Sequence, residues 1–250
     1  MPGLPKSYMK VVRDLTGYWG TYLPTLRLAP GMMGEVDDGV FVKGGNIQQF
    51  ADFDPARYLI EDQPAEEAVT QWATKAVSQQ VVGGSLAVPG SLGQGRVRLT
   101  FGQADEAAII CNGMRSAAFD DITIVKDLMR KLRDAGQWRD ELCLITDVVV
   151  VDSAWLCFST DRNQAADIVA KAAVPLPAAP LDALKAIAGN GTLEVAESSG
   201  KSSAICISLP AGGTPLFRAL RFNPAWLGLG APNLGFVKGE DNEFLEPGFG

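Results

Sequence analysis

The stretch ELCLITDVVVVDSAWLCFST, residues 141–160, holds the densest run of apolar side chains in the chain and decides the fold class. Its valine, isoleucine, tryptophan and phenylalanine side chains are stiff or bulky near the backbone and favour a pleated surface over a helix. Asp152 and Ser153 interrupt the run and predict a tight turn. We therefore expect a β-hairpin of two core strands. A membrane-spanning helix is disfavoured because Asp147 and Asp152 would lie near the bilayer centre, at a cost of about 3 kcal/mol each.

Outside this hairpin, the hydrophobic periodicity alternates between the helical and the strand repeat. Helices are expected over residues 7–15, 64–80, 122–135, 161–173 and 181–188, and strands over 40–43, 96–101, 107–111 and 214–222. Gly17 is expected to end the first helix, and Asp120 or Asp121 and Gly136 are expected at the two ends of the third. The buried stripe of the third helix is expected to be Ile122, Val125, Leu128, Met129 and Leu132. A second hairpin is expected over 192–209, where apolar residues alternate with small or polar ones on both sides of a turn at 198–201. The sequence thus predicts an α+β fold.

Composition and charge narrow the classes of function. The chain has 250 residues, 47% of them apolar and 20% charged, as in soluble globular proteins. Charged residues interrupt its first apolar residues, so no signal peptide is expected and the protein is expected in the cytoplasm. A net charge of −7 argues against nucleic acid as a partner. Buried, reduced cysteines are expected, because no short paired spacing relates Cys111, Cys143, Cys157 and Cys206.

The chain contains no histidine, which removes the commonest general base and most transition-metal sites. Its adjacent carboxylates, such as Asp37 and Asp38 or Asp120 and Asp121, fit turns and helix caps better than an acid and base pair. The glycine-rich segment from Gly228 lacks the spacing of a dinucleotide-binding loop, and residues 239–244 lack that of a calcium loop. We therefore expect neither an enzyme nor a bound metal or cofactor.

Two long segments, about 71–101 and 161–209, each combine helix-forming sequence with strand-like alternation. They could be ordinary parts of an α+β domain. They could also refold into membrane hairpins, since a barrel strand needs only about 9 to 11 residues with one apolar and one polar face. The candidate membrane-inserting residues are the apolar positions of these segments: Val81, Leu86, Val88, Val97, Leu99, Phe101, Leu193, Val195, Ile205, Ile207 and Leu209.

The last part of the chain, residues 228–250, is rich in glycine and holds one lysine against four acidic residues. Its apolar residues are spaced along it rather than clustered, as in a peptide that covers another surface. These residues are Leu229, Leu234, Phe236, Phe244, Leu245 and Phe249. We expect a main domain over 1–227 and a separable tail over 228–250.

The order of the predicted elements resembles that of the bacterial gasdermins over nearly the whole chain. The segments that carry this resemblance are, in order, the short N-terminal helix, YLPTLRLAPGMMGEVDDGVFVKGGNIQQF, RVRLTF, DDITIVKDLMRKLRDA, residues 141–160, GNGTLEVAESSGKSSAICISLP and TPLFRALRF. The likeness is one of pattern, spacing and length. It implies a gasdermin-like domain with a twisted, mostly antiparallel central sheet and flanking helices. The C-terminal peptide would hold this domain inactive as a monomer. An activating protease would remove that peptide, and a large homo-oligomer would then form β-barrel pores in the inner membrane and kill the cell in defence against phage.

The resemblance also implies contacts with membrane lipids. Basic residues near the N-terminus and on the helix expected at 122–135 could face lipid headgroups, where each contributes about 1 kcal/mol. They are Lys6, Lys10, Arg13, Lys126, Arg130, Lys131 and Arg133. The bond between Lys238 and Gly239 is a candidate cleavage site for a trypsin-like protease. The alternative function is a soluble, non-enzymatic binding or immunity module, and a histidine-free enzyme is the third.

Overall fold

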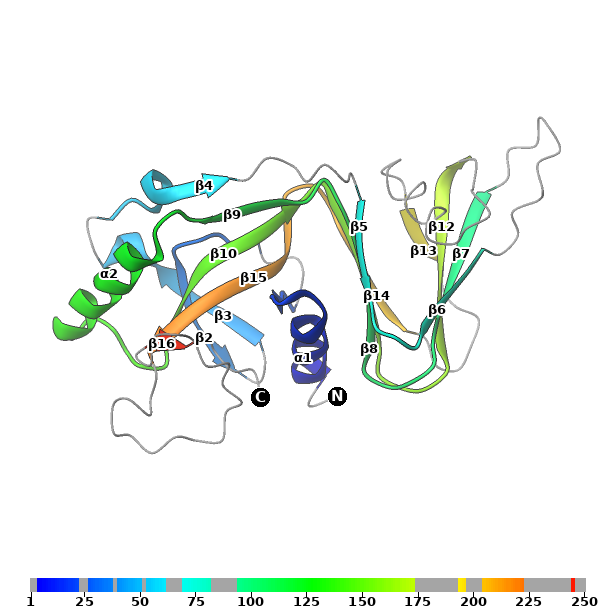
Figure 1. The fold of residues 1–250 in the computed structure, drawn as a ribbon, viewed down its shortest axis with the longest axis horizontal. Coiled ribbons are helices and arrows are strands. Elements are labelled where there is room, and N and C mark those ends of the chain that lie inside the picture. Colours follow the sequence, from blue (N-terminus) through cyan, green and yellow to red (C-terminus); the bar gives the residue numbers. More distant parts are fainter. Residues whose placement is uncertain are drawn as a thin grey trace. The chain divides into compact units, whose positions relative to one another are not determined.

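The structure is a computed structural model. It describes residues 4–22, 27–37, 40–50, 53–61, 69–81, 94–173, 193–196, 204–222 and 244–245. These residues form mostly antiparallel β-sheets and two α-helices (Figure 1). The expected α+β class is therefore confirmed.

The helices are α1 (Leu4–Thr16) and α2 (Ile122–Asp134), with 3-10 turns at Ile47–Gln49 and Pro55–Tyr58. The strands are β1 (Trp19–Gly20), β2 (Met32–Asp37), β3 (Val40–Asn46), β4 (Leu59–Glu61), β5 (Val69–Ala73), β6 (Val77–Val81), β7 (Gln94–Phe101), β8 (Glu106–Asn112), β9 (Arg115–Phe119), β10 (Cys143–Val151), β11 (Ser153–Ser159), β12 (Gln164–Ala173), β13 (Leu193–Ala196), β14 (Ile205–Leu209), β15 (Gly213–Phe222) and β16 (Phe244–Leu245).

The chain divides into two compact units. Unit 1 comprises Met1–Gln63, Arg115–Val150 and Thr214–Gly250, and unit 2 comprises Pro64–Met114 and Val151–Gly213. The chain passes between the units several times, so neither unit is one continuous segment.

Unit 1 is built on sheet A, whose main order is β1-β15-β10-β2-β3, with β9 beside β10, β4 beside β9 and β16 beside β15. Helix α2 packs its buried stripe, Val125, Met129 and Leu132, into the core that contains Phe119 and Phe222. The helix begins where the side chain of Asp121 accepts a hydrogen bond from the backbone N–H of Thr123, and Gly136 follows its end with a positive φ of 69°. The prediction of this helix and of both its ends is confirmed.

Helix α1 is also confirmed and begins three residues earlier than expected. Gly17 ends it with a φ of 76°, and its N–H donates to the carbonyl of Arg13 at 2.9 Å. The strands expected at 40–43, 96–101, 107–111 and 214–222 are present as β3, β7, β8 and β15.

Unit 2 consists of two four-stranded antiparallel sheets. Sheet B has the order β14-β11-β8-β5 and sheet C the order β13-β12-β7-β6. Each strand of sheet B is the immediate chain neighbour of the strand at the same place in sheet C. One apolar layer contains side chains from both sheets, including Leu99 and Phe101 of sheet C and Ile110 and Trp155 of sheet B.

The two sheets share not only their strand order but most of their register. Glu106 is opposite Ser159 in sheet B, and Phe101 is opposite Gln164 in sheet C, so equal lengths, 102–105 and 160–163, separate the pairs. The same holds for the neighbouring strands, where Phe158 faces Ile205 and Asp167 faces Ala196. Only the β5-β6 pair is offset, by three residues. Unit 2 is thus one four-stranded sheet folded over on itself, and we call residues 74–76, 102–105 and 160–163 the crease.

The prediction of a β-hairpin at 141–160 is wrong. Strands β10 and β11 do form, but they belong to different sheets and do not pair with each other. The N–H of Asp152, between them, donates instead to the carbonyl of Asn112 at 2.9 Å. Two-residue hairpin turns usually need a positive φ, which neither Asp152 nor Ser153 adopts. The chain therefore continues from sheet A into sheet B.

Three further expectations are wrong. Residues 69–80 and 164–173 were expected in helices and lie in or between β5, β6 and β12, because neighbouring strands offer them ladder partners that outweigh local helix propensity. The hairpin expected over 192–209 is also wrong, since β13 pairs with β12 and β14 pairs with β11. The helix expected at 181–188 lies outside the described residues.

The expectation of four reduced cysteines is wrong for two of them. Cys157 and Cys206 face each other on β11 and β14 and form a disulfide, which the search for short sequence spacings could not find because 49 positions separate them. Cys111 and Cys143 are free and buried, and burial raises the pKa of each thiol to about 12. Both thiols therefore stay protonated and unreactive near neutral pH.

We expect alkylation at pH 8 to modify no cysteine in the folded protein, two after denaturation and four after denaturation and reduction. Reduction should also lower the free energy of unfolding by up to about 4 kcal/mol, because the disulfide closes a loop between residues 49 positions apart in the unfolded chain. Mass spectrometry and urea titration measure the two effects. The Cys157→Ser/Cys206→Ser variant is the control, and its stability should not respond to reductant.

Candidate functional site

The central strands of sheet C place apolar side chains mainly on one face and polar side chains mainly on the other. Val97, Leu99 and Phe101 of β7 are each 0% exposed and face the apolar layer shared with sheet B, together with Ala166 of β12. Because successive side chains of a strand point to opposite faces, Arg98 and Thr100 lie on the other face. Sheet C is therefore amphipathic, and its apolar face is hidden inside unit 2.

The polar face carries an ion pair between its two central strands. Arg98 of β7 stands opposite Asp167 of β12, and its guanidinium donates two hydrogen bonds to the carboxylate, at 2.8 and 3.0 Å. The Asp167 side chain is 0% exposed and that of Arg98 is 39% exposed. The hydrogen bond and the charge of Asp167 raise the pKa of Arg98 above its ordinary value. Arg98 is therefore charged at every physiological pH.

The crease contains two residues with unusual backbone. Asp105 and Asn163 have φ values of 55° and 58°, and they are the non-glycine residues with positive φ in the described part of the chain. Asp and Asn tolerate this left-handed conformation better than other residues do. Their bends let Phe101 and Ala108 face the same apolar layer, although residues seven positions apart point to opposite sides of a straight strand.

Side chains also hold the crease in place. The carboxylate of Glu106, which is buried, accepts a hydrogen bond from the backbone N–H of Gln103 at 3.0 Å. On the other strand, the amide oxygen of Gln164 accepts one from the N–H of Thr160 at 3.3 Å. None of these crease residues was predicted as a site residue, because only the tertiary pairing brings them together.

The structure divides the predicted membrane-inserting residues between the two sheets. Val97, Leu99 and Phe101 form one apolar face of sheet C, and the backbones of Val81, Leu193 and Val195 lie in the same sheet. Ile205, Ile207 and Leu209 lie on β14 of sheet B, and Ile205 is 40% exposed. Leu86 and Val88 fall outside the described residues.

The predicted headgroup-binding residues have several structural contacts. Arg133 pairs with Asp140 at 3.3 Å and lies over the ring of Phe222 at 4.7 Å, and Arg130 pairs with Asp127 at 2.7 Å. Lys10 and Lys131 are exposed, whereas Lys6 and Lys126 are half-buried. Arg13 donates to the carbonyl of Gly17 and lies 5.1 Å from the ring of Trp19. Part of this basic set therefore stabilises the fold.

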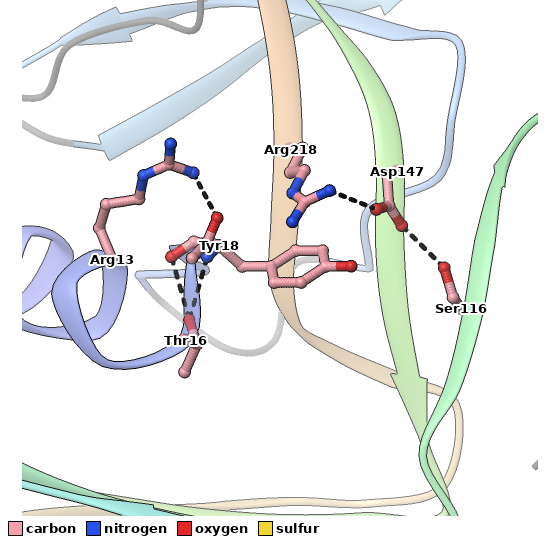
Figure 2. Close-up of polar contacts among 7 residues, drawn as sticks. Arg13, Thr16, Tyr18, Ser116, Asp147 and Arg218 are labelled. Carbon is pink, nitrogen blue, oxygen red and sulfur yellow. Dashed lines mark hydrogen bonds and ion pairs between the residues drawn. The ribbon is translucent and has the colours of Figure 1, made fainter. Parts of the chain in front are cut away.

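A polar cluster fixes the end of α1 to sheet A (Figure 2). The guanidinium of Arg218 on β15 stacks 4.2 Å from the ring centre of Tyr18 and lies 3.9 Å from the carboxylate of Asp147 on β10. That carboxylate accepts a hydrogen bond from the hydroxyl of Ser116 on β9 at 3.0 Å. The cluster thus connects the segment after α1 to three strands of sheet A.

Part of the predicted tail contacts sheet A. Phe244 and Leu245 form β16 and pair with Phe222 and Arg221 at the end of β15. Phe222 is buried against Trp138, in the core that α2 covers. Burial lowers the pKa of Arg221, whose charge lies near Cys143. The other predicted tail residues, Leu229, Leu234, Phe236 and Phe249, and the candidate cleavage site Lys238–Gly239 lie outside the described residues.

Within the described ranges, no group of histidine, cysteine or carboxylate side chains could hold a metal ion. No helix there is both long and apolar enough to cross a membrane. No model of a known protein family matches the chain, and a search of curated proteins found no similar sequence. Structure therefore defines the class: an α+β protein of two units, one of which is a folded-over antiparallel sheet.

We expect Arg218→Met to lower the free energy of unfolding by about 1 to 2 kcal/mol, because it removes both the stacking on Tyr18 and the charge beside Asp147. Urea denaturation measures this. Arg139→Met is the matched control: Arg139 pairs with Glu35 at the surface, and its loss should cost no more than about 0.5 kcal/mol. Equal effects of the two substitutions would contradict an anchoring role for Arg218.

Proposed function

We propose that this protein is an autoinhibited pore-forming protein of the gasdermin type. Proteolytic removal of its C-terminal tail would release a domain that oligomerises in a membrane, opens pores through β-hairpins and kills the cell, in defence against phage. The inactive form would be a cytoplasmic monomer, and the active form a large homo-oligomer in the inner membrane. An activating protease and membrane lipids are the partners.

The observation that carries this proposal is the shared strand order and register of sheets B and C. Opening unit 2 at the crease would turn four bent strand pairs into four long strands. Strand β8 would stay hydrogen-bonded to β11, and β7 to β12, so few backbone hydrogen bonds would have to break. A transition that conserves its ladder avoids much of the cost of exposing unpaired N–H and C=O groups to a membrane.

The dimensions and faces of sheet C suit such a transition. Strands β7 and β12 have 8 and 10 residues, close to the roughly 9 to 11 that a tilted strand needs to cross a bilayer. The face with Val97, Leu99 and Phe101 would leave the protein interior for lipid, while the face with Arg98 and Thr100 would meet water. In aqueous solution the same apolar face favours the closed form, because burial removes it from water.

In this proposal the C-terminal tail keeps the pore-forming domain inactive. Strand β16 extends sheet A at Arg221 and Phe222, beside the core that α2 covers. Its ladder is only two residues long, so cutting the chain before it would let the peptide dissociate readily. Residues 228–250 also carry an excess of acidic side chains, and their loss makes the remaining protein less negative and favours approach to anionic lipids.

We expect the intact protein to leave liposomes of phosphatidylglycerol and phosphatidylethanolamine sealed, and the cut protein to release an entrapped dye. The cut is made in place, with a site-specific protease and its recognition sequence inserted between Leu227 and Gly239. A chain with a scrambled recognition sequence is the control. Sealed liposomes after complete cleavage of a folded protein would contradict the proposal, and rings seen by electron microscopy would support it.

The crease gives a second prediction. Asp105→Val and Asn163→Val should each lower the free energy of unfolding of the intact protein by about 1 to 2 kcal/mol, because β-branched residues resist positive φ and prefer extended strands. After cleavage, the same variants should release dye faster. Asp105→Gly and Asn163→Gly are matched controls, since glycine accepts the bend. If valine destabilises the protein without accelerating dye release, the crease is not where unit 2 opens.

A soluble, non-enzymatic binding module is the second candidate. Val42 and Ile60 of unit 1 are exposed apolar side chains on short or edge strands, as a partner-binding surface would have. This alternative predicts that tail removal lowers solubility without rings or dye release, so the liposome experiment separates the two.

A further inference from the structure

The ion pair of Arg98 and Asp167 occupies a defined place in sheet C. It joins β7 of the first long segment to β12 of the second, and its residues are direct partners in the central ladder. The strands of this sheet also contain Arg96, Lys171 and Glu194. The described neighbours of Arg98 and Asp167 on the same face are polar or small: Ser78, Gln80, Thr100 and Ala165.

We propose that Arg98 and Asp167 set the ion selectivity of the pore, by forming a ring of paired charges that lines its lumen. This inference rests on the proposed pore function. If the apolar face of sheet C meets lipid, the opposite face must line the water-filled channel, and each subunit would contribute one Arg98 and one Asp167 at the same height. Rings of charged side chains select ions by their sign.

The contacts of the pair predict that the intact pair adds little selectivity of its own. The guanidinium and the carboxylate are in direct contact through two hydrogen bonds, so their charges cancel within each subunit. The pair thus allows two charged groups to lie in the central strands without adding a net charge to the lumen. Removal of one partner would leave one uncompensated charge per subunit.

The test measures reversal potentials in planar bilayers under a potassium chloride gradient, with full-length protein cut in place at the inserted protease site. Asp167→Asn should lower the permeability ratio of potassium to chloride below the wild-type value, and Arg98→Gln should raise it above that value. Both shifts should shrink as salt rises to 1 M, where the screening length falls to about 3 Å.

Paired substitutions test whether charge itself is responsible. Arg98→Gln/Asp167→Asn removes both charges, and Arg98→Asp/Asp167→Arg exchanges them, so each should return the ratio to the wild-type value. Asp37→Asn, an exposed change on β2 of unit 1, alters the net charge by the same amount and should shift nothing.

Single substitutions at a buried pair can prevent folding, so Ser78 provides an independent route. Its side chain is exposed on β6, on the same face as Arg98. Ser78→Lys should favour chloride and Ser78→Glu should favour potassium. If the cleaved protein forms conducting pores whose permeability ratio of potassium to chloride is the same in all these variants, only the selectivity inference is overturned. If a folded, cleaved protein never conducts, the pore function is overturned.

Discussion

The apolar layer between sheets B and C is the interaction on which the form of unit 2 depends. Leu99 and Phe101 from one sheet meet Ile110 and Trp155 from the other, and the hydrophobic effect keeps these faces together in water. The same strands could run on from one sheet into the other, since their order and most of their register agree. Burial of these side chains therefore holds the two sheets together, while the backbone ladders would also be compatible with the proposed open form.

The different roles of side-chain burial and of the backbone hydrogen bonds explain where unusual residues occur. Asp105 and Asn163 bend the strands at the crease, and hydrogen bonds from Gln103 and Thr160 support the bends. In the proposed open form these bends would straighten. The ion pair of Arg98 and Asp167 is different, because it lies within the ladder of sheet C and its two strands would stay neighbours in the proposed open form. A polar contact that survives the proposed transition would add no barrier to it.

The two helices of unit 1 are well anchored. Its helix α2 has a defined cap at each end and a continuous buried stripe, and α1 is held through Tyr18, Arg218 and Asp147. The short strand β16 is, by contrast, a minor part of sheet A. In the proposed mechanism, a platform that changes little would carry a unit that refolds, and a small contact would decide when refolding begins.

The sequence by itself determined the features that depend on neighbouring residues: the α+β class, the caps and stripe of α2, the left-handed Gly17 after α1, and the apolar face of Val97, Leu99 and Phe101. Periodicity reports which side chains share a face, because that is a local property of a helix or strand. Only the tertiary structure decided which strands pair. It separated β10 from β11 at Asp152, turned the alanine-rich residues 164–173 into a strand, and placed Cys157 opposite Cys206 and Arg98 opposite Asp167. These choices join residues about 50 to 70 positions apart, and local propensity is too weak to overrule the ladder partners that the rest of the chain provides.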